Sequence, residues 1–139
     1  MIVVTGGAGF IGSAIVWKLN QLEKKNIIIV DELGKDEKWK NLVGLQYDDF
    51  VNKLEFIEQI LDDVIPYNVE AIIHMGANSS TTEKDADHLM DNNYNYTKEL
   101  AKYCVEKNVR FIYASSAATY GDGSLGFDDD ESKLETLRP

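Results

Sequence analysis

The stretch Thr5-Gly6-Gly7-Ala8-Gly9-Phe10-Ile11-Gly12 decides the fold, because it follows a short β-rich run from Ile2 to Thr5 and opens a helical pattern. The helical stripe consists of Ile11, Ile15, Val16, Leu19 and Leu22. A strand, a glycine-rich turn and a helix in this order are typical of a phosphate-binding turn. Gly6 would permit the tight turn, Gly9 would let the backbone approach a pyrophosphate, and Gly12 would allow the helix to pack closely on the strand. The pattern therefore predicts a dinucleotide site.

An acid stands where such a site needs one. The second β-rich run, Ile27 to Val30, ends in Asp31, 19 residues after Gly12, where a carboxylate would bond the adenosine ribose hydroxyls. A carboxylate at that place favours NAD and repels the 2′-phosphate of NADP. Lysines that could instead pair with this phosphate are Lys35, Lys38, Lys40 and Lys53. The alternative for each of them is a solvated surface lysine.

Composition narrows the classes of function. The 139 residues suit one domain, and the formal net charge of −10 argues against a nucleic-acid partner or an anionic membrane surface. No secretory signal follows Met1, and no apolar run reaches the length that spans a bilayer. Cys104 is the only cysteine, and His74 and His88 form no paired His/Cys cluster, so we expect neither a disulfide nor a metal site. Together these features predict a cytoplasmic protein.

The rest of the chain alternates between strand and helix patterns. Further strands are expected at 45–47, 71–75 and 110–114, and further helices at 56–64 and 97–105, whereas 32–44 is expected to be a loop. This alternation predicts an α/β fold, a Rossmann-type doubly wound parallel sheet. No further strand or helix is expected after Tyr120, although a doubly wound domain needs more strands. We therefore expect 1–139 to be the N-terminal part of a longer protein, an incomplete NAD(P)-binding domain that lacks the C-terminal substrate-binding region.

Three later segments add candidate site residues. Met75-Gly76-Ala77-Asn78-Ser79 follows the fourth strand, at the edge where ligands bind in open α/β sheets. Asn92, in Asn92-Asn93-Tyr94-Asn95-Tyr96-Thr97, precedes a helix and could instead be a helix cap. Ser116, in the Ser115–Gly121 segment after the fifth strand, could carry a reactive hydroxyl or could only cap the strand end.

These motifs resemble a known group of enzymes. The spacing Gly-x-x-Gly-x-x-Gly resembles the extended branch of the short-chain dehydrogenase/reductase superfamily. Four segments, in register from residue 1 to about residue 121, resemble the ADP-L-glycero-D-manno-heptose 6-epimerase family within it. They are Thr5 to Ser13, Ser79-Ser80-Thr81-Thr82-Glu83, Met90-Asp91-Asn92-Asn93-Tyr94 and Tyr113 to Gly121.

The resemblance implies a function and a set of site residues. It implies a bound NADP, with NAD as the alternative, and an ADP-heptose substrate whose C6 loses a hydride, becomes a ketone and regains the hydride on the opposite face. Such an enzyme serves lipopolysaccharide core heptose synthesis and is expected to be a homo-oligomer. Ser116 would be the substrate-bonding hydroxyl. Cofactor contacts carry over to Phe10, Ile11, Asp31, Glu32, Lys38, Lys53, Met75, Gly76, Ala77, Asn78, Ser79 and Asn92.

Several residues depart from the family pattern. Glu32 stands where an asparagine is familiar, which weakens the case for NADP over NAD, and Met75 and Asn78 replace a glutamate and a cysteine. Tyr94 and Lys98 have the spacing of the superfamily's acid–base pair, Tyr-x-x-x-Lys, but they precede the fifth strand rather than following the serine segment.

The true acid–base pair is expected beyond Pro139, so we predict that this chain alone is inactive. Two alternatives stay open: another extended sugar-nucleotide epimerase, dehydratase or reductase, and a fragment that binds a dinucleotide, or merely folds, without catalysis.

Overall fold

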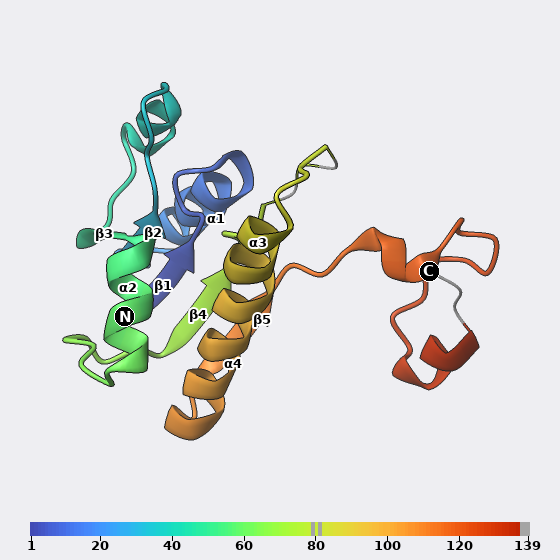
Figure 1. Cartoon of the computed structure of the whole chain (residues 1–139). Helices are drawn as coiled ribbons and strands as arrows, with labels where there is room; N and C mark the ends of the chain where they lie inside the picture. Colours follow the sequence, from blue (N-terminus) through green and yellow to red (C-terminus); the bar gives the residue numbers. More distant parts are fainter. Residues whose placement is uncertain (79, 81, 137–139) are drawn as a thin grey trace.

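The computed structural model describes residues 1–78, 80 and 82–136. In this part of the chain five parallel strands form a sheet in the order β3-β2-β1-β4-β5 (Figure 1). The strands are β1 (Ile2–Thr5), β2 (Ile27–Asp31), β3 (Asp49–Asn52), β4 (Ala71–His74) and β5 (Arg110–Tyr113). The order reverses between β1 and β4, which is the topological switch point where open α/β sheets bind ligands. The predicted Rossmann-type parallel sheet is confirmed.

Helices cover both faces of this sheet (Figure 1). The helix α1 (Phe10–Gln21) packs on one face, and α2 (Lys53–Leu61) and α4 (Tyr96–Lys107) pack on the other. A short helix, α3 (Ala86–Leu89), and a π-helical segment, η2 (Met90–Asn95), lead directly into α4. The result is a three-layer αβα domain.

Successive strand residues point to opposite faces, and two cores follow from this alternation. Val3, Ile28 and Ile72 face α2 and α4, where Phe56 and Leu100 complete the larger core. The other core lies under α1 and contains Val4, Val16, Ile27 and Ile29. All residues of β2 are buried, as expected for a central strand of a parallel sheet.

The structure corrects the predicted positions of three elements. The third strand is Asp49–Asn52, not 45–47, because Asp49–Asn52 pairs with β2 while Leu45 and Tyr47 pack from the preceding loop. The loop expected at 32–44 contains a 3-10 helix, η1 (Lys38–Leu42). The second helix ends at Leu61, before the position predicted, and the chain turns at Asp63, whose φ is +53°.

The chain after β5 forms two 3-10 helices, η3 (Ala117–Tyr120) and η4 (Glu131–Thr136). The second of them corrects the expectation that no helix follows Tyr120. Figure 1 shows this orange-to-red segment leaving the edge of the sheet beside β5. Over the described ranges, no helix has both the length and the apolar character needed to cross a membrane.

Candidate functional site

The glycine turn lies against the end of β4, at the switch point of the sheet. Gly6 has a φ of +66°, and a Cβ on it would lie 2.7 Å from the carbonyl carbon and oxygen of Met75. A Cβ on Gly12 would clash with the carbonyl oxygen of Gly6. Only glycine therefore allows the turn, the first turn of α1 and the end of β4 to approach one another this closely.

The N-terminus of α1 opens into the space above this turn. Gly9 is the N-cap residue, and Phe10 and Ile11 follow it with exposed side chains. The first N–H groups of a helix have no intrahelical partners and lie at the positive end of the helix dipole. A glycine-lined cradle with such donors fits a pyrophosphate.

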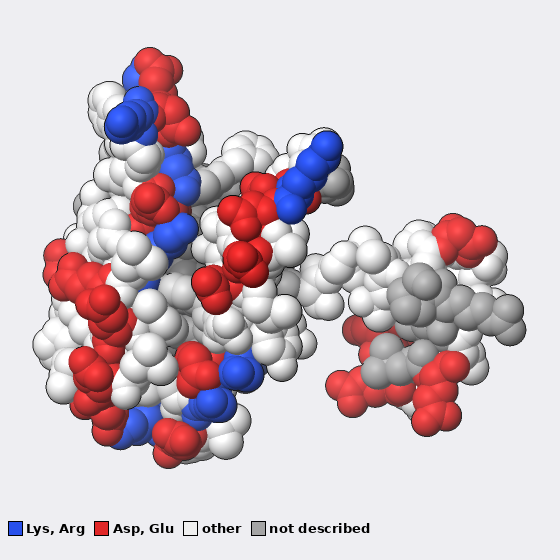
Figure 2. All heavy atoms as spheres, viewed as in Figure 1, with Lys and Arg blue, Asp and Glu red and all other residues white. Residues whose placement is uncertain are grey.

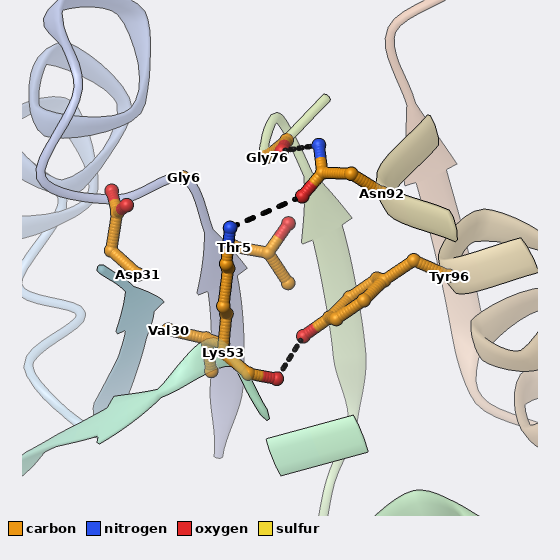
Figure 3. A pocket seen from close by; sticks show the side chains of 8 residues that line it. All are labelled: Thr5, Gly6, Val30, Asp31, Lys53, Gly76, Asn92 and Tyr96. Carbon is orange, nitrogen blue, oxygen red and sulfur yellow. Dashed lines mark hydrogen bonds between the residues drawn. The ribbon is translucent and has the colours of Figure 1, made fainter. Parts of the chain in front are cut away.

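A cleft at this edge of the sheet brings most of the predicted residues together. The predicted residues that line it are Gly6, Gly9, Phe10, Ile11, Gly12, Asp31, Lys38, Met75, Gly76, Ala77, Asn78 and Ser116. Lys53 and Asn92 line a smaller adjoining pocket with Asp31, Gly76 and Tyr96 (Figure 3). Glu32 reaches this pocket through Lys53, whereas Ser79 lies outside the described residues.

Asp31 is a buried carboxylate at the end of β2. Its Oδ2 accepts from the Ala8 N–H at 2.9 Å, and its Oδ1 accepts from the Glu32 N–H at 2.7 Å and from Lys38 Nζ at 2.5 Å. Lys38 also donates to the Glu32 carbonyl oxygen at 3.1 Å. Asp31 therefore ties the glycine turn to η1, and Lys38 covers the carboxylate that the ribose hydroxyls would reach.

Lys53 forms a second ion pair beside the first. Its Nζ lies 2.8 Å from Glu32 Oε2 and donates to Asn92 Oδ1 at 3.4 Å. The hydrogen bond from Lys53 and its charge hold the pKa of Glu32 below its usual value. The Tyr96 hydroxyl donates to the Lys53 carbonyl oxygen at 3.0 Å, which fixes the start of α2 (Figure 3).

The π-helical segment η2 carries two asparagines to the end of β4. Asn92 donates to the Gly76 carbonyl oxygen at 3.3 Å, and Asn93 accepts from the Asn78 N–H and donates to the Asn78 carbonyl oxygen. Asn92 lies inside η2, so the alternative that it caps a helix is wrong. π-helical turns often occur at functional sites, and this one faces both asparagines toward the 76–78 backbone.

His74 lies beneath the cleft in a buried hydrogen-bonded chain. Its Nδ1 lies 2.6 Å from Thr5 Oγ1 and its Nε2 lies 2.8 Å from Thr97 Oγ1, while its ring stacks with the rings of Tyr96 and Phe111. Burial lowers the pKa of His74 to about 4, so the ring is neutral at pH 7.

Comparison with known proteins assigns this chain to a family. A family model described as NAD dependent epimerase/dehydratase family matches residues 2–139. The chain belongs to this family. A protein named ADP-L-glycero-D-manno-heptose-6-epimerase from Nitratidesulfovibrio vulgaris is 55% identical over 139 residues, all of this chain and 43% of the relative's length. This chain therefore spans less than half the length of that relative.

Two solved structures are similar in fold. The crystal structure of Helicobacter pylori ADP-L-glycero-D-manno-heptose-6-epimerase has a TM-score of 0.74 and 25% identity, covering 94% of this chain and 43% of that one. A short-chain dehydrogenase/reductase superfamily protein from Agrobacterium tumefaciens with bound NAD has a TM-score of 0.65 and 30% identity, covering 87% of this chain and 34% of that one. Membership of the family makes the cofactor a nicotinamide dinucleotide, and the glycine cradle fits it.

The serine expected to act in an epimerase of this family lies at the cleft. Ser116 follows β5 and lines the cleft, and its Oγ accepts from the Ala118 N–H at 3.2 Å, where Ser116 is the N-cap of η3. Ser116 thus both caps the start of η3 and lines the cleft.

Neither Tyr-x-x-x-Lys spacing of the chain reaches that cleft. Tyr94 is exposed, and Lys98 Nζ lies 5.4 Å from the centroid of its ring. Tyr103 and Lys107 have the same spacing, but Lys107 pairs at 2.7 Å with Asp63, beyond the end of α2. Among the described residues that line the cleft, neither tyrosine is present.

Sequence reasoning missed three other residues of the site. Asn93 and His74 hold the backbone and core beneath the cleft, and Asn41 Nδ2 donates to the Ala8 carbonyl oxygen at 2.8 Å, which ties η1 to the glycine turn. Their contacts join residues far apart in the chain, so no local spacing signals them. Across residues 1–78, 80 and 82–136, no group of three His, Cys, Asp or Glu side chains could hold a metal ion.

Proposed function

We propose that this chain is the cofactor-binding part of an ADP-L-glycero-D-manno-heptose 6-epimerase. The whole protein would interconvert the D-glycero and L-glycero forms of ADP-manno-heptose for lipopolysaccharide core synthesis. The observation that carries the proposal is the 55% identity, over the whole chain, to a relative of that name. Because the chain spans 43% of that relative, the activity is proposed for the whole protein.

The cofactor that we propose is NADP. The Gly6 to Gly12 cradle supports a dinucleotide, and Lys38 and Lys53 beside Asp31 supply positive charge where a 2′-phosphate would bind. NAD is the second candidate, because the carboxylates of Asp31 and Glu32 lie at the same place. When bound, the nicotinamide supplies a reversible hydride acceptor for the carbon that is epimerised.

The chain's own residues would orient the reactants. The backbone of 76–78, held by Asn92 and Asn93, would pass along the cofactor, and the Ser116 hydroxyl would bond the C6 oxygen of the sugar. In the proposed reaction the C6 hydrogen leaves as hydride and the C6 hydroxyl gives up its proton, which forms a ketone. Hydride and proton then return, with the hydride adding to the opposite face.

Proton transfer needs an acid–base group within hydrogen-bond reach of that oxygen. Both Tyr-x-x-x-Lys spacings of this chain lie away from the cleft, so we propose that this chain alone binds cofactor without turnover.

The experiment uses the whole protein that carries this chain and ADP-D-glycero-D-manno-heptose deuterated at C6. We expect epimerised product that keeps the deuterium, read by NMR and mass spectrometry, and no product from the 139-residue chain alone. Ser116→Ala in the whole protein should lower kcat at least tenfold. Turnover of another sugar nucleotide, with ADP-heptose left unchanged, would contradict the proposed substrate.

We also propose that the protein is a cytoplasmic homo-oligomer that binds ADP-heptose rather than nucleic acid or membrane. The net charge of −10 supports the exclusion of polyanionic partners. Figure 2 shows that the lysines gathered over η1, at the top of the view, are interleaved with acidic side chains rather than forming a basic patch. Light scattering after size exclusion tests the oligomeric state.

A further inference from the structure

Lys38 and Lys53, the two lysines of the candidate cofactor site, each form an ion pair with an acidic residue of the protein. Lys38 pairs with Asp31 at 2.5 Å, and Lys53 pairs with Glu32 at 2.8 Å. The two acids are adjacent in sequence, and their lysines come from different elements, η1 and the start of α2. Two cations and two anions therefore meet within one small region at the end of β2.

The two acids differ in how firmly the protein holds them. Asp31 is 6% exposed and accepts two backbone N–H groups in addition to Lys38. The Glu32 side chain is 56% exposed, and among the described residues its carboxylate has one lysine partner, Lys53. Glu32 can therefore leave its lysine without breaking a backbone hydrogen bond of its carboxylate, whereas Asp31 is fixed by two of them.

Lys53 is held in place on its other side. Its side chain is 26% exposed, its Nζ contacts Asn92 Oδ1, and its backbone carbonyl oxygen accepts from Tyr96 (Figure 3). Lys53 and Asp31 line the same pocket. Asp31 has the position whose carboxylate accepts hydrogen bonds from the ribose hydroxyls in such domains. A phosphate on the 2′-oxygen would thus be delivered next to the Lys53 ammonium.

We infer that Glu32 occupies Lys53 as an internal competitor of the cofactor's 2′-phosphate, and that this ion pair sets the preference between NAD and NADP. The inference rests on the proposed dinucleotide site and goes beyond it by naming the residue that controls selectivity. NAD can bind with the pair intact. NADP must first displace Glu32 from Lys53 before this lysine can pair with its 2′-phosphate. Discrimination by an opposed charge is a general way to obtain specificity.

The test compares the dissociation constants of NADP and NAD by calorimetry for the wild-type chain and Glu32→Gln. We expect Glu32→Gln to lower the Kd of NADP roughly tenfold and to change the Kd of NAD less than about twofold. The matched control is Glu37→Gln, which removes the same charge from a neighbouring exposed pair with Lys40, 2.6 Å apart. We expect this control to leave the ratio of the two constants unchanged.

A second pair of variants separates competition for Lys53 from simple repulsion of the phosphate. In a Lys53→Gln background, Glu32→Gln should lose most of its effect on NADP, because the lysine for which the two anions compete is gone. An equal gain in NADP affinity with and without Lys53 would overturn the inference. So would an unchanged NADP to NAD ratio in Glu32→Gln when both cofactors bind, and in that case the dinucleotide site would stand.

Binding of neither cofactor to a cooperatively folded wild-type chain would overturn the dinucleotide site and the inference with it. An NMR readout checks the pair without any cofactor. The carboxyl pKa of Glu32 should lie below its ordinary value in the wild type and should rise in Lys53→Gln. No rise would mean that Lys53 does not hold Glu32 in solution, which also overturns the inference.

Discussion

Asn93 holds the backbone of Asn78 through both halves of its amide. Its Oδ1 accepts from the Asn78 N–H at 2.7 Å, and its Nδ2 donates to the Asn78 carbonyl oxygen at 2.9 Å. One side chain of η2 thus bonds both the backbone N–H and the backbone carbonyl of a residue just beyond β4. The segment that would pass along the cofactor is thereby fixed to the helical run 86–107 rather than left as a free loop.

Asn93→Ala should weaken binding of NAD and NADP alike. The substitution removes two hydrogen bonds to the Asn78 backbone and a third, in which Asn93 Oδ1 accepts from Asn92 Nδ2 at 3.0 Å. We therefore expect a loss of about 1–3 kcal/mol in unfolding free energy. We expect the Kd of each cofactor, measured by calorimetry, to rise about tenfold. Asn95→Ala is the control, because the Asn95 side chain in the same segment donates to exposed Asp91 and, among the described residues, to no backbone group. Equal effects of the two variants would contradict the role of Asn93.

Gly12→Ala should destabilise the domain sharply. The added methyl group would overlap the Gly6 carbonyl oxygen, so either α1 must move away from β1 or the turn must open. Overpacking of this kind costs about 1–3 kcal/mol or more in unfolding free energy. Urea unfolding followed by circular dichroism measures it. Ala14→Ser on the exposed face of the same helix should stay within about 0.5 kcal/mol of the wild type.

The buried His74 makes stability depend on pH in a defined window. Its pKa is about 4 when folded, against an ordinary value of 6.5, so the unfolded chain binds the extra proton between these values. The contribution of neutral His74 to the free energy of unfolding is fully present above pH 6.5 and is lost as the pH falls toward 4. The loss reaches about 3 kcal/mol.

Denaturant unfolding of the wild type and His74→Gln, measured across pH 4–8, tests this prediction. The wild type should be the more stable protein at pH 8, because His74 joins Thr5 and Thr97 and stacks with the Tyr96 and Phe111 rings. The gap between the two proteins should narrow as the pH falls. A gap that stays constant over the whole range would show that His74 does not become charged on unfolding there.

Tyr96→Phe should reduce the affinity for NADP more than the affinity for NAD. The variant removes the hydroxyl that donates to the Lys53 carbonyl oxygen at 3.0 Å and keeps the ring stacked on His74. We expect a cost of about 1 kcal/mol in unfolding free energy and a three- to tenfold higher Kd for NADP. Calorimetric titration with both cofactors measures the effect, and equal losses for both would contradict a role of Tyr96 through Lys53.

The sequence predicted those elements whose residues carry the signal locally. The second strand was recognisable because Ile27–Val30 is apolar throughout, as burial on both faces requires. The third strand was placed wrongly because Asp49-Phe50-Val51-Asn52 has little apolar pattern, and its pairing with Ile28–Asp31 is a long-range contact. The glycine turn was recognisable because glycines recur at the positions where two backbone segments approach each other closely.

The sequence indicated which residues belong to the site better than it indicated how they contact one another. The sequence offered Glu32, Lys38 and Lys53 as candidates, but which acid pairs with which lysine depends on how η1 and α2 are placed. Asn93 was missed because its direction depends on the π-helical geometry of η2, which shifts side chains from the faces that α-helical spacing would give.

The central claim is that this chain forms a nicotinamide dinucleotide site across the glycine turn, and calorimetric titration with NAD and NADP tests it most directly. We predict saturable one-to-one binding of at least one cofactor, together with a higher melting temperature in its presence. A chain that unfolds cooperatively but shows neither heat of binding nor a shift in melting temperature with either cofactor would contradict the claim.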